Sequence, residues 1–294
     1  MTAFVRISAF RSVTPLAFAA LLAGGCASRP EAPILENLGG SAATLTASRL
    51  DALLPADVLL LGEQHDAAEH QQIEQQVVSV LASRGLLAAL ALEMADAGAS
   101  TAQLKPGATD GQTRRALQWD DKAWPWQAYG PAVMAAVRAG VPVLGANLPR
   151  EAMPASMNNS ALDARLPGPA LKAQQQAIRI GHCELLPESQ IQPMTRIQIA
   201  RDISMATTLS QALLPGKTVV LISGSGHADR MLGVRQHLAP VIQSKTVLMQ
   251  AQSVPQATES VAGFDAVWAT PALPETDYCA QLAPGLNPAG SRTP

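Results

Sequence analysis

Acidic and histidine side chains concentrate in a few short stretches of this chain, although only 15% of its residues are charged. The stretch LLLGEQHDAAEH places Glu63, His65 and His70 directly after an apolar run, and Glu93 ends a second apolar run. His227 follows a third run, in the segment VVLISGSGH. Carboxylates and imidazoles in such positions supply general acid–base chemistry, metal ligation or recognition of a charged cofactor.

Two kinds of site fit these residue types. His65, His227 and one of the two glutamates have the composition of a catalytic zinc site, in which the other glutamate acts as general base on bound water. Arg150 or Arg201 would then stabilise an oxyanion. In the alternative, the pocket holds a carboxylate-bearing apolar cofactor such as haem, with arginine on its propionates and histidine or tyrosine on its iron. The spacing of the histidines does not choose between them.

The elements that position these residues are predicted from apolar runs and helical periodicity. Four runs that end in glycine or in polar residues are typical of buried strands of a parallel sheet: 56–62, 85–94, 141–150 and 218–227. KTVLMQAQ and FDAVWAT predict two further strands, and helical stretches separate the strands. The alternation predicts an α/β fold, with a mostly parallel sheet flanked by helices.

The carboxyl ends of parallel strands meet at one edge of the sheet, where open α/β sheets bind their ligands. That edge would receive polar side chains from four strands: Glu63 and His65, Glu93, Asn147 and Arg150, and His227. Arg201 falls on the apolar stripe of a long helix predicted over about 193–214. A buried guanidinium requires an anion, and Glu93 and Glu63 are its candidate partners.

The helix after the first strand is expected to begin at Ala67, because Asp66 and Glu69 have the spacing of a capping box. His70 falls on the buried face of this helix, which predicts a supporting role rather than direct ligation.

Two stretches, 95–128 and 151–192, fit the alternation of strands and helices poorly. Together they predict a small helical sub-domain inserted over one end of the sheet. Most of the chain's few aromatic side chains fall in or just after the first stretch: Trp119, Trp124, Trp126 and Tyr129. They are expected to form the core of that sub-domain or to cover a flat apolar ligand.

The N-terminal stretch carries two arginines, a short apolar run and the small residues LAGG, which is the layout of a secretory signal over residues 1–25. Cys26 directly after it resembles the lipidated cysteine of bacterial lipoproteins, which predicts a lipid anchor in the membrane. Ordinary cleavage that leaves Cys26 a free thiol is the alternative. Ala27 after the cysteine favours the outer membrane, on its periplasmic face. We expect a flexible leader over 26–46, a folded domain over 47–285 and a disordered tail over 286–294.

Cys183 and Cys279 form an even pair once Cys26 carries lipid, and an oxidising compartment favours a disulfide between them over two separate thiols. Neither lies in a C-x-x-C arrangement, which disfavours a redox dithiol and covalently attached haem. The net charge of −2 and the lack of a basic stripe argue against a nucleic-acid partner.

Six segments together resemble the ChaN family of haem-binding bacterial lipoproteins, grouped with the Tiki proteases, TraB and the erythromycin esterases: LLLGEQHDAAEHQQ, LALEM, PWQAYGPAVMAAVRAGVPVLGANLPR, GHCELLPE, MTRIQIARDISMA and VVLISGSGHADR. The resemblance extends over about 53–279. It implies an α/β domain with a small helical domain, a role in haem or iron acquisition, a dimer when haem is bound and an outer-membrane receptor as partner. The superfamily's polar set falls on Gly62, Glu63, His65, Glu93, Arg150, Arg201 and His227.

The resemblance implies tyrosine or histidine ligation of haem, and the chain has two tyrosines, Tyr129 and Tyr278. We expect Tyr129 to be the ligand, because Tyr278 adjoins the expected disulfide, with His65, His227 and Arg201 as further cofactor contacts. The first hypothesis is therefore a lipid-anchored haem-binding protein of iron acquisition. The alternative is a hydrolase of peptides or esters that depends on zinc or another divalent metal, with Glu63, Glu93, Arg150 and Arg201 as its catalytic residues.

Overall fold

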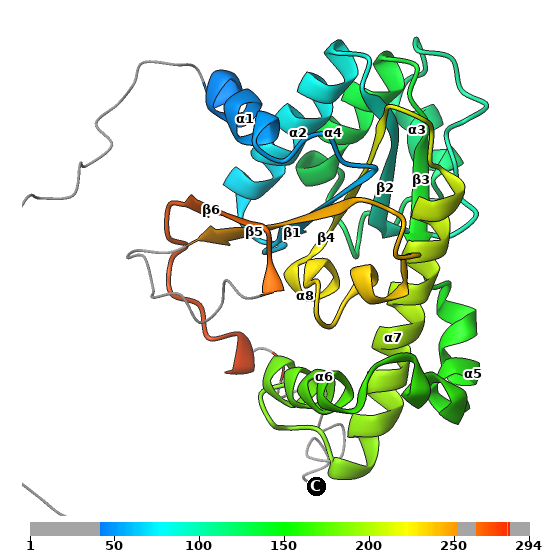
Figure 1. Cartoon of the computed structure of the whole chain (residues 1–294), viewed down its shortest axis with the longest axis vertical. Coiled ribbons are helices and arrows are strands. Elements are labelled where there is room, and N and C mark those ends of the chain that lie inside the picture. The colour runs from blue at the N-terminus through cyan, green and yellow to red at the C-terminus, as the bar shows by residue number, and fades with distance from the viewer. Residues whose placement is uncertain (1–41, 252–262, 281, 283–294) are drawn as a thin grey trace, which may run out of the picture. The chain divides into compact units, whose positions relative to one another are not determined.

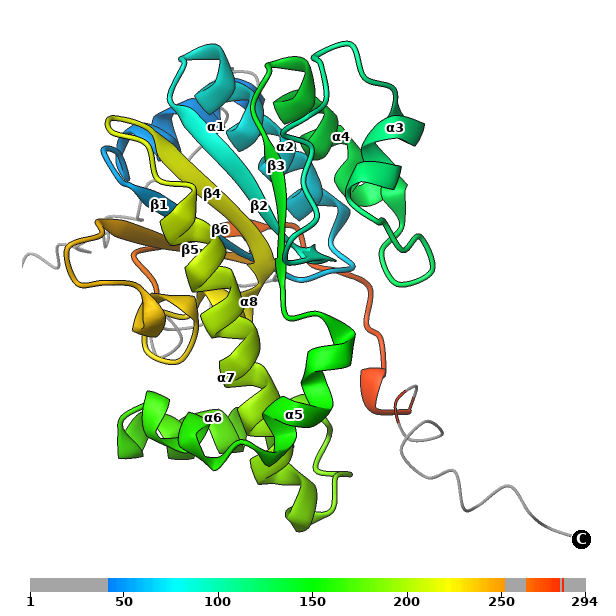
Figure 2. The same cartoon turned by 90° about the vertical axis from the view of Figure 1, so that its right-hand side faces the viewer.

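The computed structural model describes residues 42–251, 263–280 and 282, and its core is a six-stranded sheet with helices on both faces (Figures 1 and 2). The strand order is β3-β2-β4-β1-β5-β6, and every pair of neighbours is parallel. All six predicted strands form, so the predicted α/β class is confirmed. The strands are β1 (Val58–Glu63), β2 (Leu87–Asp96), β3 (Val143–Asn147), β4 (Thr218–Gly224), β5 (Ser244–Ala251) and β6 (Ala266–Thr270).

Helix α1 precedes β1, and the other labelled helices lie in the connections between strands. The α-helices are α1 (Ala42–Asp51), α2 (Ala68–Ser83), α3 (Asp110–Ala116), α4 (Trp126–Arg138), α5 (Met153–Asn158), α6 (Gly168–Gly181), α7 (Glu188–Gln211) and α8 (Ser225–Ala228). Short 3-10 helices are η1 (Arg150–Ala152), η2 (Ser160–Arg165) and η3 (Val234–His237). None of the helices in the described ranges is both long enough and apolar enough to cross a membrane.

Side chains of the central strands alternate between two apolar cores, one on each face of the sheet. Leu59 and Leu61 of β1 pack on the face that α2 and α4 cover, whereas Val58 and Leu60 pack on the face that α7 covers. A strand buried on both faces needs apolar residues at successive positions, which explains the unbroken apolar runs in the sequence. Alternate residues of a strand form a row on one face of the sheet. The row that contains a strand-end residue therefore determines which helices its side chain contacts.

The helical sub-domain is built from the second of the two predicted stretches. Leu162 and Leu166 pack against Ile199 and Ala200 of α7, beyond the carboxyl edge of the sheet. The first stretch, 95–128, differs from the expectation and does not join it, since α3 lies beside α4 in both views (Figures 1 and 2).

The aromatic side chains hold that first stretch on α4. The ring of Trp119 lies 5.0 Å from that of Trp126 and 6.1 Å from that of Tyr129. These rings join the core between the sheet, α2 and α4 rather than a separate sub-domain.

The start of the folded chain lies earlier than expected. Residues 42–46, assigned to the flexible leader, form the beginning of α1, and Thr46 is buried and donates a hydrogen bond to Gln76 at 2.6 Å. The predicted signal peptide, Cys26, the rest of the leader and the tail over 286–294 lie outside the described residues.

The predicted capping box does not form. Helix α2 begins at Ala68, and its N-cap Ala67 has no side-chain hydrogen bond. Asp66 instead accepts a hydrogen bond from the hydroxyl of Tyr278, at 2.5 Å. A long-range partner has displaced the local one.

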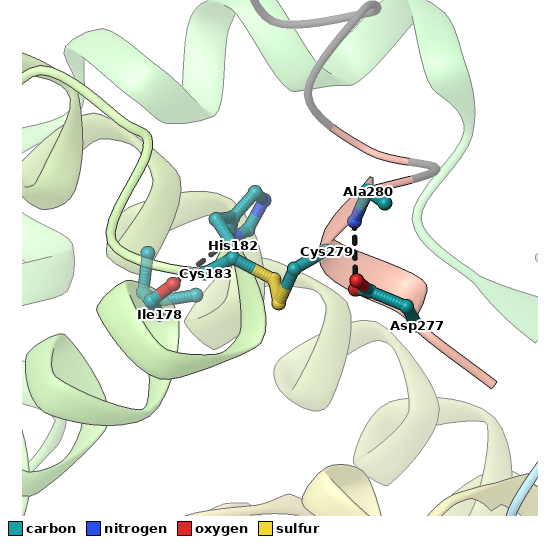
Figure 3. Close-up of a disulfide and its surroundings, with 6 residues drawn as sticks. All are labelled: Ile178, His182, Cys183, Asp277, Cys279 and Ala280. Carbon is teal, nitrogen blue, oxygen red and sulfur yellow. Dashed lines mark hydrogen bonds between the residues drawn. A yellow bond between two sulfur atoms is a disulfide. The ribbon is translucent and has the colours of Figure 1, made fainter. Parts of the chain in front are cut away.

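The predicted disulfide between Cys183 and Cys279 is confirmed (Figure 3). It joins the turn between α6 and α7 to the segment that follows β6, across 96 positions of sequence.

Candidate functional site

Glu63 ends β1 in the row of Leu59 and Leu61, so its side chain points toward α2 and α4 and is buried. Its Oε1 accepts a hydrogen bond from the hydroxyl of Tyr129 at 2.7 Å. Nδ1 of His65 lies 2.8 Å from the same oxygen. Its Oε2 accepts from the amide of Gln71 at 3.0 Å. Three donors thus fix one carboxylate.

Glu74 of α2 is a buried acid that the sequence analysis missed. Its side chain is fully buried, and burial together with the charge of Glu63 raises its pKa well above the ordinary value. The protonated form of Glu74 is therefore favoured, because a second buried charge beside Glu63 is unfavourable. The spacing of four residues from His70 to Glu74 to Val78 was the signal for its burial.

Glu93 belongs to the opposite row of β2, with Ala89 and Ala91, and so faces α7. Arg201 Nη2 donates to Oε1 at 2.6 Å, and the backbone N–H of Gly224 donates to Oε2 at 2.7 Å. Burial opposes ionisation of Glu93, but the charges of His227, Arg201 and His65 outweigh it and hold its pKa far below the usual range.

His227 lies on α8, directly after β4, between two carboxylates. Its Nδ1 lies 2.6 Å from Asp202 Oδ1, and its Nε2 lies 3.5 Å from Glu93 Oε1. Burial opposes protonation of the ring, but Glu93 and Asp202 outweigh it and raise the pKa of His227 to about 9. Burial also raises the pKa of Asp202, to about 6. Near pH 7 the pair is an imidazolium and a carboxylate.

His65 lies between the Glu63 and Glu93 clusters. Its Nε2 is 4.0 Å from Glu93 Oε2, and its ring packs edge-on against Trp124 at 4.9 Å. Burial opposes protonation of His65, but its hydrogen bond to Glu63 and the charge of Glu93 outweigh it and raise its pKa. A Cβ on Gly224 would lie 2.9 Å from Nε2, so the glycine leaves room for the ring.

The cluster opens onto a hollow of about 580 Å³ at the carboxyl edge of the sheet, which we call the edge hollow. Its lining includes Glu63, His65, Glu93, Arg201, His227 and Tyr278. Tyr278 lies at its rim, with 48% of the residue exposed.

The structure brings five of the sequence-predicted residues into one connected network: Glu63, His65, Glu93, Arg201 and His227. Asn147 joins it by accepting a hydrogen bond from Arg201 Nε at 2.8 Å. Arg150, in η1, is exposed and does not line the edge hollow. Asp202 was not singled out as a site residue, although it follows Arg201 on the same helix. The roles of these residues stay predictions.

The two other candidates have supporting positions. Tyr129 is only 1% exposed and donates to Glu63 instead of facing the edge hollow. His70 is buried, accepts the backbone N–H of Gln64 at 3.0 Å, and contacts Thr270 Oγ1 at 2.9 Å. It therefore holds the backbone between Glu63 and His65, as its place on the helix predicted.

A metal site finds no support in this geometry. Within the described ranges, no three His, Cys, Asp or Glu side chains come together as metal ligands do. Both oxygens of Glu93 already accept hydrogen bonds, and one ring nitrogen of each histidine faces a carboxylate. The expected zinc set of His65, His227 and Glu93 is therefore tied up in ion pairs.

Comparison with known families decides the family. The model of a family described as haem-binding uptake, Tiki superfamily, ChaN matches residues 49–238. The chain belongs to the ChaN family. No curated protein matches it.

Two solved structures resemble this ChaN family member. One is described as cofacial haem binding to ChaN of Campylobacter jejuni, and the sequence of that protein is 25% identical to this chain. The TM-score is 0.58, and the match covers 71% of this chain and 87% of that one. The type III effector HopBA1 is 14% identical, with a TM-score of 0.50 and coverage of 78% and 94%. At that identity the second likeness shows the fold alone.

Proposed function

We propose that this ChaN family member binds haem at the edge hollow, with Tyr278 as the ligand of the iron. The family and the Campylobacter jejuni relative support haem as the cofactor. The observation that carries the proposal is the place of Tyr278, a half-exposed phenol at the rim of a hollow that positively charged side chains also line. Tyrosine is an established ligand of haem iron, and bound haem would supply an iron centre for it.

The residues around Tyr278 suit this role. The hydroxyl of Tyr278 donates a hydrogen bond to Asp66, which holds the phenol at the rim of the edge hollow. The same bond raises the pKa of the phenol, so bound iron would have to lower that pKa for Tyr278 to ligate as a phenolate. Tyr129 fits less well than the sequence suggested. Withdrawing its buried hydroxyl would leave the carboxylate of Glu63 without one of its donors, which is costly.

The charges of the edge hollow suit the propionates of haem. Arg201 lies in the lining with 21% of its side chain exposed; it donates through Nε to Asn147 and through Nη2 to Glu93, so its remaining amino group, Nη1, is the candidate donor to a propionate. His227 is held between Asp202 and Glu93 and supports the charge of Glu93 instead.

The shallow form of the site agrees with a cofacial arrangement. Two haems stacked face to face cover one face of each other, so each protein chain needs to cover only the other face. Ile180 and Leu185 expose apolar surface on the segment that the disulfide joins to Tyr278. We therefore propose a homodimer as the haem-bound state, to be tested by mass measurement in solution with and without haemin.

The test of haem binding is a haemin titration followed in the Soret region. We expect a saturable shift for the wild type, binding about tenfold weaker or more for Tyr278→Phe, and unchanged binding for Tyr129→Phe. Equal binding by wild type and Tyr278→Phe would refute the assigned ligand. A wild type without a saturable shift would refute haem binding.

We also propose a role in iron or haem acquisition, as a lipoprotein attached to the outer membrane through Cys26, with an outer-membrane haem or iron receptor as its partner. The lipoprotein-like N-terminal sequence supports the anchor. Cys26→Ser is expected to move the protein from the membrane fraction to the soluble fraction, and the wild-type protein to carry the mass of an added lipid. A wild-type protein without that mass would contradict the anchor.

A second candidate, hydrolysis of an ester or peptide without a metal, is favoured by one observation. Glu63 holds Nδ1 of His65 at 2.8 Å and is itself fixed by Tyr129 and Gln71, which is how a carboxylate orients a general base. His65→Ala should abolish hydrolysis of model esters in the presence of a chelator, and Tyr278→Phe should not. Equal rates for wild type and His65→Ala would exclude it.

A further inference from the structure

The segment that carries Tyr278 has almost no packing of its own. Residues 271–280 follow β6 along the surface, and every one of them except the partly buried Leu273 is exposed. No apolar side chain of this segment reaches a core, in contrast to the strands and helices. Burial therefore does not explain why Tyr278 stays at the edge hollow.

Hydrogen bonds do not explain it either. Within the segment, Tyr278 N–H donates to Thr276 O at 3.1 Å, and Ala280 N–H donates to Asp277 Oδ1 at 2.9 Å (Figure 3). Among described residues, two links join the segment to the rest of the protein: the hydroxyl of Tyr278 on Asp66, and the disulfide from Cys279 to Cys183. One exposed hydrogen bond is too weak to order a chain segment against its conformational entropy.

The other end of the disulfide is firmly placed. Cys183 follows α6, where its N–H donates to Ile180 O at 2.9 Å, and His182 Nδ1 lies 2.8 Å from Ile178 O. Cys183 and Glu184 have φ of 55° and 57°, a conformation that non-glycine residues keep only where the surroundings impose it. Helix α6 packs on α7, the helix that carries Arg201 to the site. The disulfide therefore connects Tyr278 to the framework of the site.

We propose that the Cys183–Cys279 disulfide positions Tyr278 at the edge hollow, so that haem binding depends on the thiol redox state of the protein. The inference rests on the proposed haem function. A dithiol reductant supplies two electrons and two protons and becomes a disulfide itself, while the S–S bond breaks and Cys183 and Cys279 become thiols. The segment is then held by one hydrogen bond, and Tyr278 leaves the hollow for most of the time.

The expected size of the effect follows from the fraction of molecules that keep Tyr278 in place. The apparent dissociation constant rises in inverse proportion to that fraction. If one molecule in ten retains the position after reduction, haem binds about tenfold more weakly. Tyr278→Phe removes the ligand itself, so loss of the disulfide has no further effect in that variant.

The experiment compares four full-length proteins, all with Cys26→Ser so that no third thiol interferes: the parent, Tyr278→Phe, the double variant Cys183→Ser/Cys279→Ser, and the combination. Haemin titration gives the affinity and the visible band of a phenolate bound to iron(III). Serine variants avoid adding a reductant that would also reduce haem iron. Should the double variant misfold by circular dichroism, the parent is reduced, alkylated with iodoacetamide and freed of reagent before titration.

Hydrogen–deuterium exchange of residues 271–280 without haemin provides a second readout. In the double variant we expect haemin to bind about tenfold more weakly, the phenolate band to disappear and residues 271–280 to exchange faster than in the parent. In the combination, we expect the affinity for haemin to equal that of Tyr278→Phe. Full affinity in the double variant, with weaker binding in Tyr278→Phe, would overturn the inference and leave the proposed function standing. If the parent binds no haemin, the proposed haem function itself is wrong. If residues 271–280 exchange at the same rate in the parent and in the double variant, the disulfide does not position the segment.

Discussion

Arg201 and Glu93 form an ion pair of 2.6 Å that joins helix α7 to the end of β2. The carboxylate is buried, and the small Ala89 and Ala91 in the same row let α7 approach the sheet closely enough for the arginine to reach it. The pair therefore stabilises the packing of the helix as well as the charge of the site.

Arg201→Ala is expected to lower the free energy of unfolding by about 3 kcal/mol, because it leaves the buried carboxylate of Glu93 without its arginine partner. Urea unfolding at pH 7 measures this. Arg84→Ala is the matched control, since its ion pair with Asp51 is largely exposed and should contribute less than about 1 kcal/mol. Similar losses for the two variants would contradict a buried, structurally important pair at Arg201.

The stability of the protein is expected to fall between about pH 7 and pH 9. The pKa of His227 is raised in the folded state from 6.5 to about 9, so its contribution is complete below the unfolded value and is lost as the pH rises through the folded one. The loss should approach about 3 kcal/mol. When the free energy of unfolding is measured with urea across this range, it should change clearly less with pH in His227→Gln than in the wild type. The same pH dependence in both proteins would exclude the histidine as the cause.

The strands and the edge on which the site lies were predictable because unbroken apolar runs have one common explanation, a parallel sheet covered on both faces. Glu63 and Glu93 stood out because each ends such a run. Their different surroundings follow from strand alternation, which sends Glu63 toward α2 and Glu93 toward α7. Local sequence thus determined the position and direction of both acids.

The choice between the two tyrosines could not be made from sequence, because it depends on contacts between distant residues. Tyr129 reaches Glu63 across 66 positions, and Tyr278 reaches Asp66 across 212. The second contact also removed Asp66 from its expected capping role. Asp202 was overlooked because it adjoins Arg201, and only the orientation of α7 decides which of the two turns toward His227.

Tyr129→Phe and Tyr278→Phe make the same chemical change at a buried and at an exposed tyrosine. Tyr129→Phe should lower the free energy of unfolding by about 1–2 kcal/mol, because the buried carboxylate of Glu63 loses a donor. Tyr278→Phe should change it by less than about 0.5 kcal/mol. Thermal or urea unfolding without haemin measures both. Equal effects would show that Tyr129 has no special role in holding Glu63.

Glu74→Gln tests whether the buried acid of α2 is protonated. Because burial and the charge of Glu63 raise its folded pKa, Glu74 contributes stability below its unfolded pKa of about 4.5 that is lost as the pH rises through the folded value. Glutamine keeps the shape of the neutral acid and does not titrate. The free energy of unfolding of the variant should therefore equal that of the wild type near pH 4.5 and exceed it increasingly at higher pH, as measured by urea unfolding at several pH values. Glu69→Gln, at an exposed position of the same helix, is the control and should show no such trend. If Glu74→Gln has a lower free energy of unfolding than the wild type at high pH, Glu74 is ionised and paired in the folded protein.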